Sequence, residues 1–449
     1  MPSLWSWDMT ERQRFALGEL AGFHRGVTWS KTQEIAEPEP GSVPVLRIPN
    51  IQTRLDTTDL VWLRNVRKTS MEQCAAAKDW ILMVGSNGNP ERVGNCILIN
   101  EPNEFLFASF LVGIEPTRRE IVSPEFLFNL LQGPDVQRHI SNDVQGSTGL
   151  SNINLTRLKA KVVECPPLLE QRRIAEILST LAETIEQTEA LISKHQQIKT
   201  GLIRDLFTRG VSSNGYLRPT REQAPDLYKA SRLGWLPKEW EIVSAEELCP
   251  SITKGATPAQ FIPQDRSSSV PFIRVQNLTF DGSLAFDEDQ AFISRSSSRG
   301  ELGRSRVLPG DILMNIVGPP LGKVSLIPDT YPEWNINQAI AIFRPVLASV
   351  REYLSSFLSS DIAQTWFLGR AKRTSGQVNL TLEMCRQLPI PKPREEEELR
   401  RISYALVCAD RRIKSERSYL GKLIEQKHGL MHDLLTGRVR VHVEEAEDN

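Results

Sequence analysis

The segment Gly201-Leu202-Ile203-Arg204-Asp205-Leu206-Phe207-Thr208 returns 228 residues later as Gly429-Leu430-Met431-His432-Asp433-Leu434-Leu435-Thr436. At the same offset, Arg172-Arg173-Ile174 returns as Arg400-Arg401-Ile402. Shorter matches precede these in the same order: Ser42–Ile48 with Ser269–Val275, Gly26-Val27-Thr28 with Gly255-Ala256-Thr257, Ile81-Leu82-Met83 with Ile312-Leu313-Met314, and Asn154-Leu155-Thr156 with Asn379-Leu380-Thr381. Self-similarity at a fixed period indicates repeated structural units. The sequence therefore predicts a tandem duplication, each repeat a mixed globular part followed by a long helix.

The long helices are predicted from an apolar stripe that advances in alternating steps of four and three residues. Sustained over several heptads, this pattern is typical of a coiled-coil seam. Prolines before each stripe stop an upstream helix from continuing into it, and Gly210 and Gly437 lie where each helix should end. The predicted seam residues are Ile174, Leu178, Leu181, Ile185, Ile192, Leu202, Leu206, Ile402, Leu406, Ile413, Leu420, Leu423, Leu430 and Leu434.

Each stripe also contains polar residues in equivalent slots, Thr188 with Glu416 and Lys199 with Lys427. Polar residues in a seam lower stability but fix register. The alternative is that these positions face solvent at the edge of the helix pair.

The twin helix of the same chain is the most available partner for each stripe. Antiparallel pairing would place the two globular parts at opposite ends of the helix pair, about a pseudo-two-fold axis. Ile174–Leu206 would span about 50 Å at 1.5 Å per residue. DNA presents equivalent groove faces about 34 Å apart, so such a pair suits two readers on separated half-sites.

The expected fold class is α+β, with two similar mixed α/β domains separated by two long helices that form an antiparallel intramolecular coiled coil. Short apolar runs bounded by Gly, Pro, Asn and Ser predict the strands. The predicted divisions are a first domain at 1–165, a first helix at 166–210, a linker at 211–234, a second domain at 235–390, a second helix at 391–440 and an acidic tail at 441–449.

Composition narrows the class of protein without naming a function. The 449 residues are 40% apolar and 24% charged, with 54 Lys+Arg against 55 Asp+Glu. This is an ordinary globular composition, and its balance gives no general argument for nucleic-acid binding. The absence of a signal-peptide pattern or long apolar run, with six scattered cysteines, favours a cytoplasmic protein with reduced thiols.

The chain resembles the specificity subunit of type I restriction–modification systems. Pro166–Ile174 and the two helix ends at 205–208 and 433–437 carry the resemblance, together with Gly234–Trp240 and Leu308–Met314. The resemblance implies two target-recognition domains that read an asymmetric, bipartite double-stranded DNA target. It also implies two methyltransferase subunits, which would supply S-adenosylmethionine and act on adenine, and restriction subunits in the full complex.

The chain departs from the family pattern where the second helix begins. The first helix is entered through Pro167-Leu168-Leu169-Glu170-Gln171, whereas the second is entered through Pro393-Arg394-Glu395-Glu396-Glu397-Glu398. The Glu-Gln pair is expected to be lost there, with two residues gained.

No catalytic residue, metal ligand or bound cofactor is expected in this chain. The run 318–324 is one residue short of a phosphate-binding loop and lacks the Ser or Thr that follows its lysine. Asn89-Pro90-Glu91-Arg92 lacks the aromatic residue that stacks a flipped base. His428 and His432 lie four apart, but no third ligand has diagnostic spacing, so two exposed histidines are the favoured interpretation.

Clusters of basic residues are the candidate DNA contacts. One arginine recurs at the same motif position in both halves, as Arg47 and as Arg274. Each is predicted either to bind phosphate or to form a structural salt bridge. Gly26 and Gly255 likewise predict either backbone contacts to DNA or plain turns. The full candidate set is Arg47, Arg64, Arg67, Lys68, Arg118, Arg119, Arg274, Arg295, Arg299, Arg304, Arg306, Arg370, Lys372 and Arg373.

The sequence thus predicts a non-catalytic DNA-specificity subunit that recruits methyltransferase and restriction subunits. The alternative is a coiled-coil adaptor of the same architecture that binds protein partners without reading DNA. Specific DNA binding should weaken steeply with salt, whereas the adaptor should show no such dependence.

Overall fold

The structure is a computed structural model that describes residues 12–441, with gaps at 53, 144, 148, 266–267, 288, 319 and 375–376. Side chains are also left undescribed at 145–147, 372–374 and 377. The expected acidic tail beyond Val441 lies outside the described residues. The chain divides into two compact units, unit 1 (Met1–Glu189 with Ser418–Asn449) and unit 2 (Ala190–Arg417). The expected α+β class with two mixed domains and long helices is confirmed.

Unit 1 is built on small, mostly antiparallel sheets covered by short helices. The central sheet has the order β2-β10-β6-β8 and joins Ala21–Arg25, Leu111–Pro116, Ile81–Val84 and Cys96–Leu98. A second sheet, β3-β5-β4-β9, joins Glu34–Ile35, Val61–Leu63, Val43–Leu46 and Leu106–Phe107. Two smaller sheets are β1-β13 (Gln13–Ala16, Val162–Cys165) and β7-β12-β11 (Ser86–Asn87, Leu150–Asn152, Gln145–Ser147). The short helices are α1 Leu17–Leu20, α2 Lys68–Gln73, α3 Pro124–Gln132, α4 Pro134–Asp143 and α5 Leu155–Ala160.

Unit 2 repeats the strand order of the central sheet and of the two smaller sheets, and it adds a two-stranded sheet, β14-β15 (Tyr228–Ser231, Gly234–Pro237). Its central sheet, β17-β25-β21-β23, joins Ser251–Lys254, Ile340–Arg344, Ile312–Asn315 and Val324–Leu326. The second sheet, β19-β18-β24-β20, joins Phe292–Ser294, Ser269–Ile273, Trp334–Ile336 and Arg306–Val307. The smaller sheets are β16-β28 (Glu241–Ser244, Pro389–Lys392) and β22-β27-β26 (Val317–Gly318, Gln377–Asn379, Lys372–Thr374). The short helices are α7 Ala245–Leu248, α8 Arg295–Arg299, α9 Ala348–Leu358, α10 Asp361–Leu368 and α11 Leu382–Arg386.

The two repeats agree down to strand register. Met83 of β6 pairs with Val112 of β10, and Met314 of β21 pairs with Ala341 of β25. Each second sheet has one parallel pair, β4 with β9 and β18 with β24. The shared motifs therefore mark equivalent positions of one repeated fold.

The recurring Gly26 and Gly255 lie against the parallel strands of these second sheets. A Cβ atom on Gly26 would lie 2.2 Å from the carbonyl oxygen of Ala108, and one on Gly255 would lie 2.0 Å from that of Asn337. No side chain fits at either position, because the obstructing atoms are backbone. This close packing accounts for both glycines as parts of the fold.

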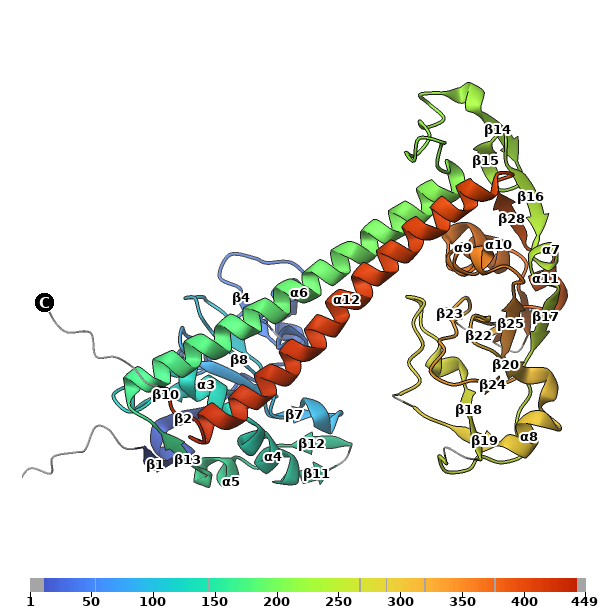
Figure 1. The fold of residues 1–449 in the computed structure, drawn as a ribbon. Helices are drawn as coiled ribbons and strands as arrows, with labels where there is room; N and C mark the ends of the chain where they lie inside the picture. The colour runs from blue at the N-terminus through green and yellow to red at the C-terminus, as the bar shows by residue number, and fades with distance from the viewer. Residues whose placement is uncertain are drawn as a thin grey trace, which may run out of the picture. The chain divides into compact units, whose positions relative to one another are not determined.

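The long helices are α6 (Leu168–Thr208, 41 residues) and α12 (Glu396–Leu435, 40 residues), drawn green and red in Figure 1. In unit 1, Ile174 and Leu178 near the start of α6 share a core with Leu434 at the end of α12. In unit 2, Leu206 at the end of α6 shares a core with Ile402 and Leu406 near the start of α12. Within each unit, therefore, the two helices run antiparallel.

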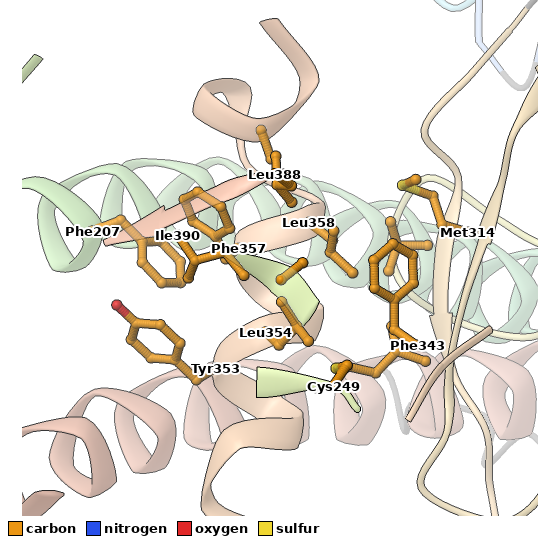
Figure 2. Packing of buried hydrophobic residues seen from close by; sticks show 14 of the residues in the cluster. Phe207, Cys249, Met314, Phe343, Tyr353, Leu354, Phe357, Leu358, Leu388 and Ile390 are labelled. Atoms are coloured by element: carbon orange, nitrogen blue, oxygen red, sulfur yellow. The ribbon is translucent and has the colours of Figure 1, made fainter. Parts of the chain in front are cut away.

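The C-terminal end of each long helix enters the globular core of a unit. Phe207 of α6 packs edge-on against Tyr353 and Phe357 of α9, with ring centroids 4.9 and 5.2 Å apart. Figure 2 shows this cluster with Leu354 and Ile390 around it. The repeat equivalent of Phe207 is Leu435, which lies in the core of unit 1.

The seam positions are withdrawn from solvent, including the polar ones. None of the predicted apolar seam residues is exposed, and Ile174, Ile402 and Leu406 are fully buried. Thr188 is 6% exposed, and the side chains of Lys199 and Glu416 are each 16% exposed. Burial lowers the pKa of Lys427. These values argue against the alternative that the polar slots face solvent.

A buried glutamate lies at the start of each long helix. In unit 1, the Glu170 carboxylate accepts hydrogen bonds from Arg12 at 3.0 Å and Arg440 at 3.3 Å. Arg12 also donates to the carbonyl oxygens of Leu434 and Leu435 in the last turn of α12. We call Glu170, Arg12 and Arg440 the Glu170 clasp.

The Glu398 clasp of unit 2 consists of Glu398, Arg218 and Trp240. The Glu398 carboxylate accepts from Arg218 at 2.9 Å, from Trp240 Nε1 at 3.2 Å and from the backbone N–H of Val211 at 3.0 Å. Glu398 thus occupies the position of Glu170, at the offset of the other helix matches. The expected loss of the Glu-Gln pair is wrong for the glutamate and holds only for Gln171, which Leu399 replaces.

Candidate nucleic-acid interface

The segment that follows β5 in unit 1 carries the most available positive charge among the candidates. Arg64 follows β5, Arg67 precedes α2, and Lys68 begins it. All three side chains are exposed. Among the described residues none of them has a carboxylate within ion-pair distance, although Arg64 lies 3.4 Å from the carbonyl oxygen of Thr32. Uncompensated, exposed cations of this kind suit phosphate contacts.

Arg118 and Arg119 belong to a different element and are compensated. Both follow β10 and are exposed. Arg118 forms an ion pair with Glu120, and Arg119 forms one with Asp79 at 2.8 Å. Arg118 and Arg119 therefore differ from Arg64, Arg67 and Lys68 in already having carboxylate partners.

Arg47 and Arg274 have the same surroundings in both units. Arg47 forms an ion pair with Asp59 at 3.0 Å, and Arg274 forms one with Asp289. In each case the backbone N–H of the arginine donates to an asparagine three residues later, Asn50 or Asn277, whose amide donates to carbonyl oxygens of the following loop.

This shared Arg-x-x-Asn arrangement accounts for the recurrence of Arg47 and Arg274 without DNA, and it favours the structural salt bridge over the phosphate contact. The asparagine was missing from the sequence-based candidates. Its fixed spacing in both halves was the signal that could have found it.

The α8 region of unit 2 contains a buried acceptor for two of its arginines. The Glu333 side chain, which is 8% exposed, forms ion pairs with Arg306 at 2.8 Å and with Arg299 at 3.5 Å. A buried network in which Ser298 donates to Asn335 at 2.6 Å holds α8 on β24. Arg304 is exposed and Arg295 is half-buried, and neither has a carboxylate partner among the described residues.

The last candidates lie beside the small sheet β22-β27-β26. Arg370 follows α10, and its guanidinium stacks on the Trp366 ring at 4.4 Å from the centroid. Lys372 and Arg373 are in β26, but their side chains are outside the described set. Lys323, which follows β22, lies over the ring of Phe280, which is 60% exposed. Exposed cation–aromatic pairs of this kind, which sequence reasoning missed, suit stacking and phosphate contacts together.

The described residues show no cluster of side chains suited to metal binding. They include no group of three or more His, Cys, Asp or Glu side chains that could hold a metal ion. All six cysteines are unpaired, and burial raises the pKa of Cys96, Cys165, Cys249 and Cys385 to about 12. Helices that are long and apolar enough to cross a bilayer are absent from the described part of the chain.

Comparison with known proteins gives a consistent result. Residues 9–196 match the family model for the type I restriction modification DNA specificity domain. The chain is 24% identical over 402 residues to the putative type I restriction enzyme MjaX specificity subunit of Methanocaldococcus jannaschii, covering 89% of this chain and 87% of that protein. It is 24% identical over 395 residues to the type I restriction enzyme EcoKI specificity subunit of Escherichia coli, covering 86% and 80%.

Two solved structures share the fold. The S subunit of a type I restriction–modification system from M. genitalium superposes with a TM-score of 0.54 at 13% identity, covering 96% of this chain and 98% of that one. A chain from a structure of complex assembly and conformational transition of the type I R-M system gives a TM-score of 0.51 at 16% identity, covering 95% and 98%.

Proposed function

We propose that this chain, which is similar over most of its length to type I restriction–modification specificity subunits, is itself a non-catalytic specificity subunit. It reads a bipartite, asymmetric DNA target with the globular parts of its two repeats. Methyltransferase subunits dock on the long helices and supply S-adenosylmethionine and methyl transfer to adenine. Restriction subunits join them in the full complex, and the complex works in the cytoplasm, where its DNA is.

The observation that carries the proposal is that two repeats of one topology have different sequences in equivalent strand pairs. The antiparallel strands β11 and β12 read Gln-Gly-Ser at 145–147 and Leu-Ser-Asn at 150–152. Their equivalents, β26 and β27, read Lys-Arg-Thr at 372–374 and Gln-Val-Asn at 377–379. A common scaffold with divergent side chains supports two readers with different half-sites, because base edges are distinguished by side chains rather than by backbone.

We further propose that α6 and α12 set the spacing between the half-sites. Each helix is continuous over about 60 Å at 1.5 Å per residue. Inserting one heptad in both helices adds about 10 Å, or roughly three base pairs at 3.4 Å per step. Methylation mapping should then find a longer spacer between unchanged half-sites. An unchanged spacer would contradict this role of the helices.

Salt-dependent binding separates DNA reading from the adaptor alternative. The complex with its methyltransferase subunits is titrated with target duplex at several salt concentrations. Removing two phosphate contacts in the variant Arg64→Ala/Arg67→Ala should reduce the slope of log K against log salt by about 1.8. The matched control is Arg118→Ala/Arg119→Ala, which removes two arginines that already have carboxylate partners, and its slope should fall less. Salt-independent binding of the parent complex, or no binding, would favour the adaptor.

A further inference from the structure

Three positions on one face of the long helices carry opposite charge in the two repeats. On α6 they are Glu183, Glu186 and Glu189, which we call the acidic face. At the offset of 228 they become Arg411, Lys414 and Arg417 on α12, which we call the basic face. Positions three residues apart are neighbours on a helix surface, so each set is a continuous stripe. A complete reversal contrasts with the apolar seam, which keeps its character in both repeats.

In unit 1, the acidic face receives a loop of the globular part. The loop is closed by a bridge between Ile51 and Leu55. Arg54 of this loop donates to the Glu186 carboxylate at 2.7 Å. The two side chains are 78% and 53% exposed, so this ion pair is a surface contact.

In unit 2, the basic face receives the equivalent loop with opposite charge. This loop is closed by a bridge between Leu278 and Leu284, and its Asp281 forms an ion pair with Arg417. Asp281 also accepts hydrogen bonds from Thr279 and from the backbone and side chain of Ser283. Burial raises the pKa of Asp281, but these hydrogen bonds and Arg417 outweigh it and hold the pKa well below its ordinary value.

The two loops are equivalent by position as well as by contact. Each follows the Arg-x-x-Asn arrangement of Arg47 or Arg274, and Arg54 corresponds to Asp281 at the offset of that motif. The second loop is the longer of the two, and it reaches a point one helical turn farther along the face, since Arg417 corresponds to Glu189. Both charges of a loop–helix contact have therefore changed sign together.

We propose that this paired reversal directs each globular part to its own long helix. If the first loop met the basic face, Arg54 would lie beside Lys414 or Arg417. If the second loop met the acidic face, Asp281 would lie beside glutamates. Both exchanged arrangements place like charges together, and specificity is gained from such repulsion as well as from attraction.

A mechanism of this kind is needed because the repeats share one topology. A globular part could otherwise pack on the twin helix or on the helix of a second copy, as in domain swapping. On the proposed function, moreover, two identical methyltransferase subunits would require the same charge at equivalent docking positions. The inverted face therefore suits contacts within the chain better than a docking site shared by those subunits.

Charge reversals on the helix side test the proposal while leaving the loops intact. The full-length chain is examined by amide hydrogen exchange for residues 48–58 and 275–287, and its dimer fraction after refolding is measured by light scattering. Glu186→Arg should speed exchange of the first loop, and Arg417→Glu should speed that of the second, each about two- to fivefold for a surface pair. Adding Arg54→Glu to Glu186→Arg should restore the first loop, as a double-mutant cycle requires.

Two exposed charges on the same helices outside the faces provide controls. Glu425→Arg is the control for Glu186→Arg and should leave the exchange rate of residues 48–58 unchanged. Lys194→Glu is the control for Arg417→Glu and should leave the exchange rate of residues 275–287 unchanged. The combination Glu186→Arg/Arg417→Glu should raise the dimer fraction after refolding. Unchanged exchange in both single reversals, or failure of the double variant to restore the first loop, would overturn the proposal. Because neither DNA nor partner subunits are present, these results do not depend on the proposed function.

Discussion

The Glu398 clasp gives the sharpest test of how the second repeat is held together. Glu398 and Arg218 have only 5% and 10% of their side chains exposed. Burial lowers the pKa of Arg218, but Glu398 and Glu239 outweigh this effect and raise it, so the arginine stays charged. Replacing one partner of a buried pair leaves the other charge uncompensated, which costs about 3–5 kcal/mol. Glu398→Gln keeps the shape and one acceptor oxygen, so we expect a loss of about 3 kcal/mol in unfolding free energy.

The matched control is Glu239→Gln, which makes the same chemical change opposite the same arginine. Glu239 lies 3.0 Å from Arg218, but its side chain is 75% exposed. An exposed pair contributes roughly 0–1 kcal/mol, so this variant should be close to the parent. Urea is the suitable denaturant, because guanidinium chloride would screen the ion pairs being compared. Unfolding is followed by circular dichroism and tryptophan fluorescence.

A second variant separates the buried charge from the lost hydrogen bonds. Adding Arg218→Met to Glu398→Gln removes the uncompensated guanidinium, while the amide oxygen of the new glutamine still accepts from the Val211 N–H. Removing both charges of a buried pair is often nearly neutral, so most of the lost stability should return. A cost of Glu398→Gln below about 1 kcal/mol, or an equal cost for Glu239→Gln, would refute this account of the clasp.

Three further predictions concern packing, the seam and pH. Gly255→Ala should destabilise unit 2 by several kcal/mol, because the added Cβ atom would lie 2.0 Å from a backbone oxygen. Gly201→Ala is the control: Gly201 lies in a helix, its added Cβ atom would meet no atom within 4 Å, and the variant should be about 1 kcal/mol more stable. Both free energies of unfolding are measured in urea. Lys427→Met should raise stability because burial lowers the pKa of this lysine, whereas Lys199→Met should not, since Lys199 pairs with Asp410 at 2.5 Å. The pKa of Asp281 is lowered in the folded state, so its carboxylate stabilises the fold at pH 7. The difference in unfolding free energy between the parent and Asp281→Asn should therefore shrink as the pH falls below about 4. Urea unfolding measured at each pH checks this.

The repeat and its apolar pattern allowed much of the fold to be predicted from sequence. The short apolar run Ile81–Val84 predicts a strand, and β6 occupies those residues with every side chain buried. The stretch Pro124–Leu131 predicts a helix, and α3 begins at Pro124 after Ser123, whose side chain accepts a hydrogen bond from the Phe126 N–H. Such elements are predictable because periodicity and capping act over a few residues.

The partners of charged side chains could not be predicted in the same way. Glu333 receives two arginines from elements far earlier in the chain, and Asp79 receives Arg119. No local pattern indicates these contacts, since they depend on how distant segments pack. For the same reason, a cluster of arginines in the sequence predicts positive charge without telling which members are already compensated. The acidic run at the start of α12 likewise gave no sign of which glutamate is buried.

The differences between the two repeats follow the cost of removing each contact from water. Gly26 and Gly255 are retained because a backbone atom occupies the space of a side chain. The buried carboxylate is retained at Glu170 and Glu398, but one donor to it has changed from Arg12 to Trp240, which keeps an N–H and discards a charge. Where the contact is fully or partly exposed, as between Arg54 and Glu186 and between Asp281 and Arg417, both charges have been inverted. Such an inversion costs little as long as the two charges change together. Divergence is therefore freest on the surface, and this is where two readers of unlike DNA half-sites would need it.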